Sequence, residues 1–88
     1  MSPAPATKPP KNATLATFAT RLRTRRAELG LSQEEAASRA GIHWTGYSRL
    51  ERAQAAPGLY LTLKIARGLK TTPGALLDGL PISDTAER

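Results

Sequence analysis

Residues 30–52 read GLSQEEAASRAGIHWTGYSRLER, and this stretch decides the fold. Ser32 is followed three residues later by Glu35, which predicts a capping box in which each side chain accepts a hydrogen bond from the other's backbone N–H. We therefore expect a helix over 33–40. Gly41 predicts the end of that helix, because glycine adopts a left-handed backbone at little cost. A second short helix is expected over 44–52, so the stretch predicts two short helices joined by a tight turn.

The helix over 44–52 divides into two flanks when its residues are placed at about 100° intervals around the helix axis. Tyr47 and Leu50 fall on one flank and are expected to be buried, with the Tyr47 hydroxyl in contact with water. The opposite flank carries the polar and aromatic side chains Trp44, Thr45, Ser48, Arg49 and Arg52. A short helix with such a flank suits the major groove of DNA, with its neighbour as a brace.

Three further helices are predicted outside this stretch. A stripe of apolar residues predicts a helix over 14–29, and Gly30 predicts its end. A helix over 59–69 is expected to be mostly buried, because its apolar residues cover more than one face. Thr72 and Pro73 predict the cap and first residue of a short helix that ends at Leu77. Because no strand pattern occurs, we expect a compact all-α domain of five helices.

The folded domain is expected over 14–77, between two tails. Residues 1–13 are rich in Pro, Ala, Thr and Lys and are expected to be a disordered tail. The alternative is a basic arm that reaches into a minor groove. Residues 78–88 are expected to be a C-terminal tail that takes part in a dimer contact. That contact is predicted to use the apolar residues near this end, Leu76, Leu77, Leu80 and Ile82.

The chain has 13 lysines and arginines against 7 acidic residues, a net charge of +6. Most of the excess lies in the folded middle and attracts phosphate backbones, although a solvated basic surface is the plainer interpretation. Without cysteine there is no disulfide framework or thiolate metal site. No apolar run is long enough to span a membrane, and the N-terminus lacks the apolar core of a signal peptide, so we expect a cytoplasmic protein.

From roughly Phe18 to Leu77 the chain resembles the lambda-repressor-like helix-turn-helix family of the Cro and XRE type. The resemblance rests on pieces that occur in order at the family's spacing: Gly30-Leu31-Ser32-Gln33-Glu34-Glu35, Ala37, Gly41-Ile42, Tyr47-Ser48-Arg49-Leu50-Glu51-Arg52, Pro57, Leu63-Lys64-Ile65-Ala66 and Leu76-Leu77. Histidine at position 43, where Ser or Thr is usual, is also similar to some controller proteins of restriction–modification systems. The resemblance implies a five-helix fold in which 33–40 and 44–52 are the DNA-reading pair.

The resemblance also implies roles for individual residues. Base contacts are expected from Trp44, Thr45, Ser48 and Arg49, and phosphate contacts from Gln33, His43, Arg52 and Arg26. Arg26 is further expected to form an ion pair with Glu51, and this structural role is the favoured one. For Trp44, packing back onto the helix over 33–40 stays open as an alternative. Ala37 is expected to be small because the helix over 44–52 crosses close to it.

Together these features predict a sequence-specific transcription regulator that binds double-stranded DNA. A homodimer on two half-sites about 34 Å apart is expected, because one short helix contacts only a few base pairs. The alternative is an antitoxin-like module whose main partner is another protein. We expect no enzyme activity, cofactor, metal site or small-molecule ligand, because no phosphate loop, metal cluster or paired carboxylates occur and His43 stands alone.

Overall fold

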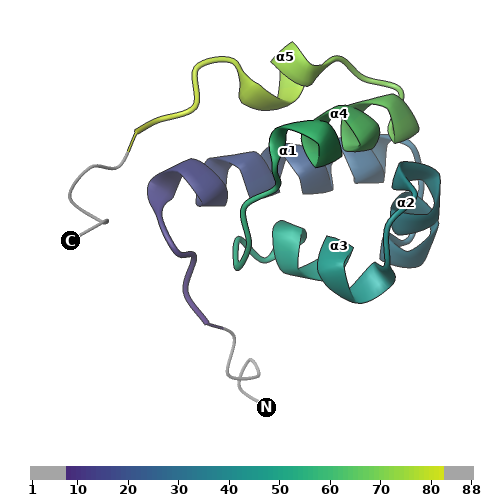
Figure 1. Cartoon of the computed structure of the whole chain (residues 1–88), viewed down its shortest axis with the longest axis horizontal. Coiled ribbons are helices and arrows are strands. Elements are labelled where there is room, and N and C mark those ends of the chain that lie inside the picture. Colours follow the sequence, from purple (N-terminus) through teal and green to yellow (C-terminus); the bar gives the residue numbers. More distant parts are fainter. Residues whose placement is uncertain (1–7, 83–88) are drawn as a thin grey trace.

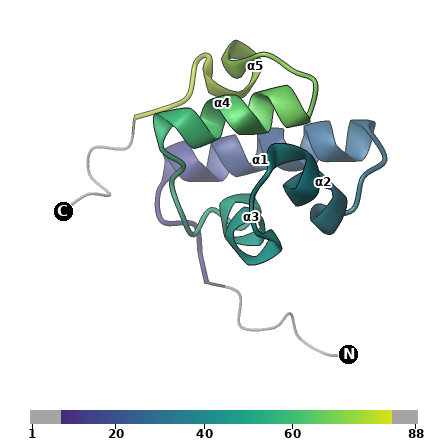
Figure 2. The same cartoon turned by 45° about the vertical axis from the view of Figure 1, so that its right-hand side comes forward.

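The computed structural model describes residues 8–82, and within that part of the chain it contains five helices and no strand. The helices are α1 (Ala13–Glu28), α2 (Gln33–Ala40), α3 (Trp44–Glu51), α4 (Leu59–Gly68) and α5 (Pro73–Leu77). Helices α1 and α4 run through the middle of the molecule, with α2 and α3 on one side and α5 on the other (Figures 1 and 2). The predicted all-α fold is confirmed. No helix over 8–82 combines the length and apolarity needed to cross a membrane.

The helix ends lie where the local sequence predicts them. In the capping box, the Glu35 amide donates to the Ser32 hydroxyl over 3.0 Å, and the Ser32 amide donates to the Glu35 carboxylate over 2.8 Å. Gly41 ends α2 with a φ of 73° in the left-handed region. Thr72 caps α5, whose first residue is Pro73. Local hydrogen bonding therefore accounts for the boundaries of the short helices.

All five helices contribute to a single core. Its buried members are Phe18, Leu22, Ala36, Ala37, Ala40, Tyr47, Leu50, Ile65, Ala66, Leu69 and Leu76. Ala37 is only 1% exposed, in keeping with the small residue expected where α2 meets α3. A second close approach was not predicted: a Cβ added to Gly68 would lie 2.5 Å from the backbone oxygen of Arg39. Glycine at the end of α4 thus allows α4 to approach the backbone of α2.

The prediction that α4 is mostly buried is wrong. Leu59, Tyr60 and Leu63 are 78%, 74% and 44% exposed. Within α4, only the flank that carries Thr62, Ile65 and Ala66 is buried. The physical reason is that α2 and α5 both pack on α4 but leave the flank that carries Leu59, Tyr60 and Leu63 exposed. The apolar composition of α4 therefore exceeds what the core of one chain uses.

The C-terminal apolar residues also divide in a way that the sequence did not show. Leu76 is 2% exposed and belongs to the core, so its predicted place in a dimer contact is corrected. Leu80 packs against that core and is partly buried. Leu77 and Ile82 remain exposed and are still available to a partner. Residues 83–88 of the predicted C-terminal tail lie outside the described residues.

The structure differs from the predicted disordered tail at residues 8–13. The Lys11 amide donates to the Ala53 carbonyl over 3.1 Å, and the Gln54 side-chain amide donates to the Pro9 carbonyl over 2.8 Å. Residues 9 and 11 thus contact the loop that follows α3, and α1 begins at Ala13 (Figure 1). Residues 1–7 of the predicted tail lie outside the described residues.

Candidate nucleic-acid interface

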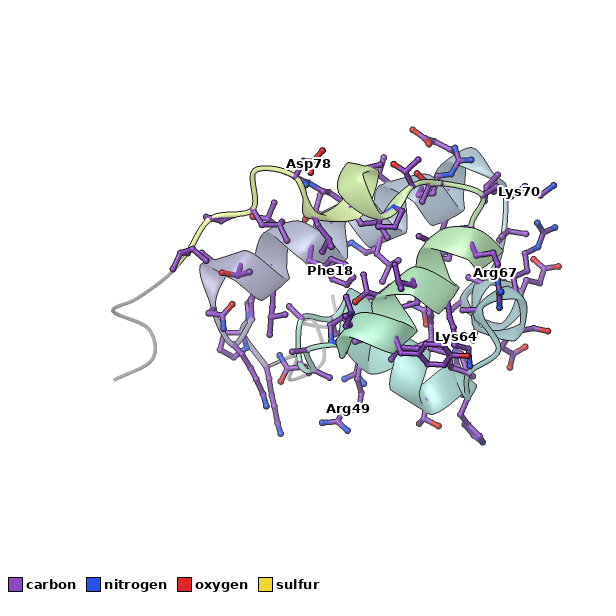
Figure 3. The ribbon with its side chains drawn as sticks, turned by 45° about the horizontal axis from the view of Figure 1, so that its top comes forward. Phe18, Arg49, Lys64, Arg67, Lys70 and Asp78 are labelled. Atoms are coloured by element: carbon purple, nitrogen blue, oxygen red, sulfur yellow. The ribbon has the colours of Figure 1, made fainter. Side chains whose placement is uncertain are left out.

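One flank of α3 is open along its length. Thr45, Arg49 and the cap residue Arg52 are exposed, and Ser48 is partly buried. The opposite flank is closed, with Tyr47 and Leu50 only 0% and 2% exposed. Figure 3 shows Arg49 pointing away from the ribbon. The side chains predicted to contact bases therefore share a flank that the protein's own interior leaves free.

The first turn of α3 presents Trp44 and Gly46. Trp44 is 47% exposed, so nearly half of its surface is accessible at the tip of the helix. A Cβ added to Gly46 would meet nothing within 4 Å. No contact within residues 8–82 therefore requires glycine at position 46. Glycine within a helix nevertheless costs about 1 kcal/mol relative to alanine.

His43 is the cap of α3, in place of the usual Ser or Thr. Its Nδ1 accepts from the Thr45 amide over 3.5 Å and lies 2.8 Å from the Thr45 hydroxyl oxygen. When Nδ1 accepts, the ring N–H lies on Nε2, which leaves one donor for another acceptor. His43 thus orients Thr45 and keeps an N–H suited to a phosphate oxygen.

Glu51 holds the C-terminal end of α3 and is only 1% exposed. Arg26 Nε donates to one carboxylate oxygen over 2.6 Å, and Arg26 Nη2 donates to the other over 3.0 Å. Gln33 Nε2 donates to the second oxygen over 2.9 Å. The predicted ion pair between Arg26 and Glu51 is therefore present, and the cluster joins α1, α2 and α3. Such a two-pronged contact fixes orientation as well as distance.

Each of the three guanidinium nitrogens of Arg26 donates a hydrogen bond within the protein, and the side chain is 22% exposed. Its third nitrogen, Nη1, donates to the Leu31 carbonyl over 2.9 Å. The hydrogen bond to Glu51 raises the pKa of Arg26 further above its already high value. These contacts favour the structural role of Arg26 over a contact to phosphate.

Gln33 occupies the first position of α2, next to the free amides of a helix N-terminus. Its side chain is partly buried and is bound to Glu51, so its position is set from within the protein. The side-chain amide has a second N–H that this bond does not use. A phosphate contact from Gln33 therefore requires no loss of the internal bond, and it stays a prediction.

Tyr47 corrects a further expectation. Its hydroxyl is buried and forms no hydrogen bond within the described chain, rather than lying in water. Burial, followed by the adjacent negative charge of Glu51, raises the pKa of Tyr47 well above its usual range. The ring therefore packs as a core residue at the cost of one unpaired polar atom.

Sequence reasoning did not place Gln54 on this surface, and it placed Lys8 and Lys11 near DNA only in the alternative of a basic arm. Together with Arg49 and Arg52 they line a pocket of about 400 Å³ at the C-terminal end of α3. The signal available beforehand was weak, because two lysines in a proline-rich tail are also typical of a disordered segment.

The comparisons with known proteins agree with this geometry. The family model for a helix-turn-helix domain matches residues 17–80. The restriction–modification controller protein C.AhdI from Aeromonas hydrophila has a similar structure, with a TM-score of 0.72 and 37% identity. That match covers 74% of this chain and 98% of the controller protein. No curated protein matches the sequence.

Two further structures are similar. A hypothetical transcription factor from Neisseria has a TM-score of 0.71 and 29% identity, over 94% of this chain and 91% of its own. A transcriptional regulator of the HTH_3 family from Vibrio cholerae has a TM-score of 0.69 and 27% identity, over 72% of this chain and 35% of its own. The chain belongs to the helix-turn-helix domain family, and its fold is shared with controller proteins and transcriptional regulators.

Proposed function

We propose that this protein is a transcription regulator that binds double-stranded DNA sequence-specifically, with α3 in the major groove. The observation that carries the proposal is the division of α3. Its Tyr47 flank is closed and its Arg49 flank is open, while Glu51 fixes the helix to α1 and α2. A rigidly held helix with an accessible polar flank is what reading base edges requires.

The proposed base contacts come from Trp44, Thr45, Ser48 and Arg49. The guanidinium of Arg49 suits O6 and N7 of guanine, the most common specific contact between proteins and DNA. The methyl group of Thr45 and the exposed indole of Trp44 suit a thymine methyl group. Ser48 is partly buried, and its hydroxyl is proposed to form a hydrogen bond to a base edge.

The proposed phosphate contacts come from Gln33, His43 and Arg52. Gln33 lies in the first turn of α2, where free amides and the helix dipole favour an anion. His43 offers the ring N–H that its cap bond leaves unused. Arg52 is exposed at the end of α3 and forms no ion pair within residues 8–82. Such contacts position the protein on the duplex without selecting its sequence.

We further propose that the protein acts as a homodimer. Helix α3 has eight residues, a length of roughly 12 Å at about 1.5 Å per residue, so one copy contacts few base pairs. The exposed apolar residues of α4, Leu59, Tyr60 and Leu63, offer a surface for a second copy. Two copies reading half-sites about 34 Å apart supply the affinity that one short helix lacks.

The test is selection of bound duplexes from a random-sequence pool, with wild type and Arg49→Ala in parallel. Wild type is expected to enrich a motif with two related halves. Arg49→Ala should lose preference at one position of each half, at a cost of about 1–3 kcal/mol in binding. Failure of wild type to enrich any motif overturns the proposed function. An unchanged motif with Arg49→Ala overturns the role of that arginine.

A further inference from the structure

Residues 8–11 lie against the C-terminal end of α3, and a buried side chain holds them there. Gln54 is 8% exposed, and its Nε2 donates to the Pro9 carbonyl over 2.8 Å. The same nitrogen lies 3.4 Å from the Lys8 carbonyl oxygen and 3.3 Å from the Arg52 carbonyl oxygen. A single amide therefore joins the segment before α1 to the end of α3.

A backbone hydrogen bond provides a second attachment. The Lys11 amide donates to the Ala53 carbonyl over 3.1 Å. Ala53 has a φ of 59°, in the left-handed region that non-glycine residues enter at some cost. Its carbonyl and the neighbouring Gln54 side chain bind the segment together. We call residues 8–11 the N-terminal arm.

The pocket between the arm and α3 is strongly cationic. Its lining consists of Lys8 and Lys11 from the arm, Arg49 and Arg52 from α3, and the neutral Gln54. None of the four cations forms an ion pair with a carboxylate of residues 8–82. Four like charges around one pocket repel each other, so the arrangement favours an anionic occupant.

We propose that the N-terminal arm is part of the DNA-binding surface, and that Lys8, Lys11 and Arg52 bind a phosphate of the strand whose bases face Arg49. The proposal rests on the proposed function, because Arg49 and the arm then face the same duplex. The loop residues 53–56 carry no positive charge, and the arm supplies at this point the cations that the loop lacks. Gln54 acts as a positioning residue through its bonds to the arm.

The first experiment measures affinity of the full chain for a selected duplex and for a scrambled duplex, at 50 and 200 mM salt. Lys11→Gln is compared with Lys70→Asn, since each removes one positive charge. Lys70 is exposed in the turn after α4, far from Arg49 in Figure 3, and asparagine tolerates its positive φ of 54°. Lys11→Gln should weaken both duplexes by the same factor, whereas Lys70→Asn should leave both unchanged.

The double variant Lys8→Gln/Lys11→Gln sets the size of the effect. Loss of one phosphate contact per protomer should reduce the salt-induced loss of affinity by about 3.5-fold per protomer, because each contact contributes about 0.9 to the logarithmic slope. A salt slope equal to that of wild type overturns the proposal. Weakening confined to the selected duplex also overturns it, because the arm would then read bases.

The variant Gln54→Leu tests the position of the N-terminal arm separately from the charge of its lysines. This variant keeps the net charge but removes the donor that holds the arm. It should weaken binding of both duplexes, and adding Lys8→Gln/Lys11→Gln to it should then cost less than in wild type. Full additivity overturns the positioning role of Gln54. If wild type itself binds neither duplex in a salt-dependent way, the proposed function fails and this proposal fails with it.

Discussion

Helices α3 and α4 both lie at the surface, and their open flanks differ in chemistry. The open flank of α3 carries Thr45, Arg49 and Trp44, whereas the open flank of α4 carries the apolar Leu59, Tyr60 and Leu63 beside Arg67. Both helices bury only one flank in the same core. The difference shows that one small core can support two separate surfaces, one suited to a polar, charged partner and the other to an apolar partner.

The helices also differ in how they are held. Helix α3 is fixed by the buried polar cluster around Glu51, with ligands from α1 and α2. Helix α4 is fixed by packing, including the close approach of Gly68 to the backbone of Arg39. The hydrogen bonds to Glu51 set the rotation of α3 about its own axis, because a two-pronged contact tolerates little change of angle.

The largest expected effect on stability comes from removing the Glu51 carboxylate that holds α3. Glu51→Ala leaves Arg26 without its buried partner and should lower the free energy of unfolding by about 2–4 kcal/mol, a range reduced for the partial exposure of Arg26. Thermal and urea unfolding measure the change. Glu28→Ala is the control, because it breaks the exposed ion pair with Arg25 and should cost less than about 1 kcal/mol. Equal losses in both variants contradict the anchoring role.

The next comparison uses one glycine from each helix. Gly68→Ala should destabilise the fold by about 1–3 kcal/mol, because its Cβ would meet the Arg39 backbone. Gly46→Ala should stabilise it by about 1 kcal/mol, because its Cβ meets nothing and alanine favours the helix. Urea unfolding of both variants checks the opposite signs. If Gly46→Ala also weakens DNA binding, the duplex approaches α3 closely at that residue.

The open flanks of α3 and α4 can be distinguished by the partner that each is proposed to bind. Leu59→Asp/Leu63→Asp should shift sedimentation equilibrium toward the monomer and weaken binding to a two-half-site duplex about tenfold or more, since paired half-sites supply much of the affinity. Arg49→Ala should leave self-association unchanged while it alters base preference. Loss of self-association in Arg49→Ala, or its retention in the double variant, contradicts the assignment of α4 to the dimer contact.

The smallest expected effect concerns the Tyr47 hydroxyl and pH. Because burial raises the pKa of Tyr47 in the folded state, the unfolded state alone ionises just above a pH of about 10. The stability that depends on a neutral Tyr47 hydroxyl is therefore complete below the unfolded pKa. It is lost as pH rises above that pKa, at up to about 1.4 kcal/mol per pH unit. Tyr47→Phe should show a smaller loss between pH 9 and 11 in urea unfolding. Equal slopes for both proteins contradict the burial of the hydroxyl.

Much of the fold was predictable because its signals are local. The capping box of Ser32 and Glu35, the left-handed Gly41 and the start of α5 at Pro73 each depend on residues within one turn. The division of α3 followed from the helical period alone, and the structure confirms its closed flank. The roles of Trp44 and Arg49 toward bases remain predictions.

The sequence by itself determined the number and ends of the helices and the flank of α3 that is buried, because those features depend on hydrogen bonds and periodicity within a few residues. Only the tertiary structure decided that α4 leaves Leu59 and Leu63 exposed, and that Gln54 meets Pro9, 45 residues away along the chain. These outcomes depend on which elements come together in space, and neither composition nor local spacing specifies that arrangement.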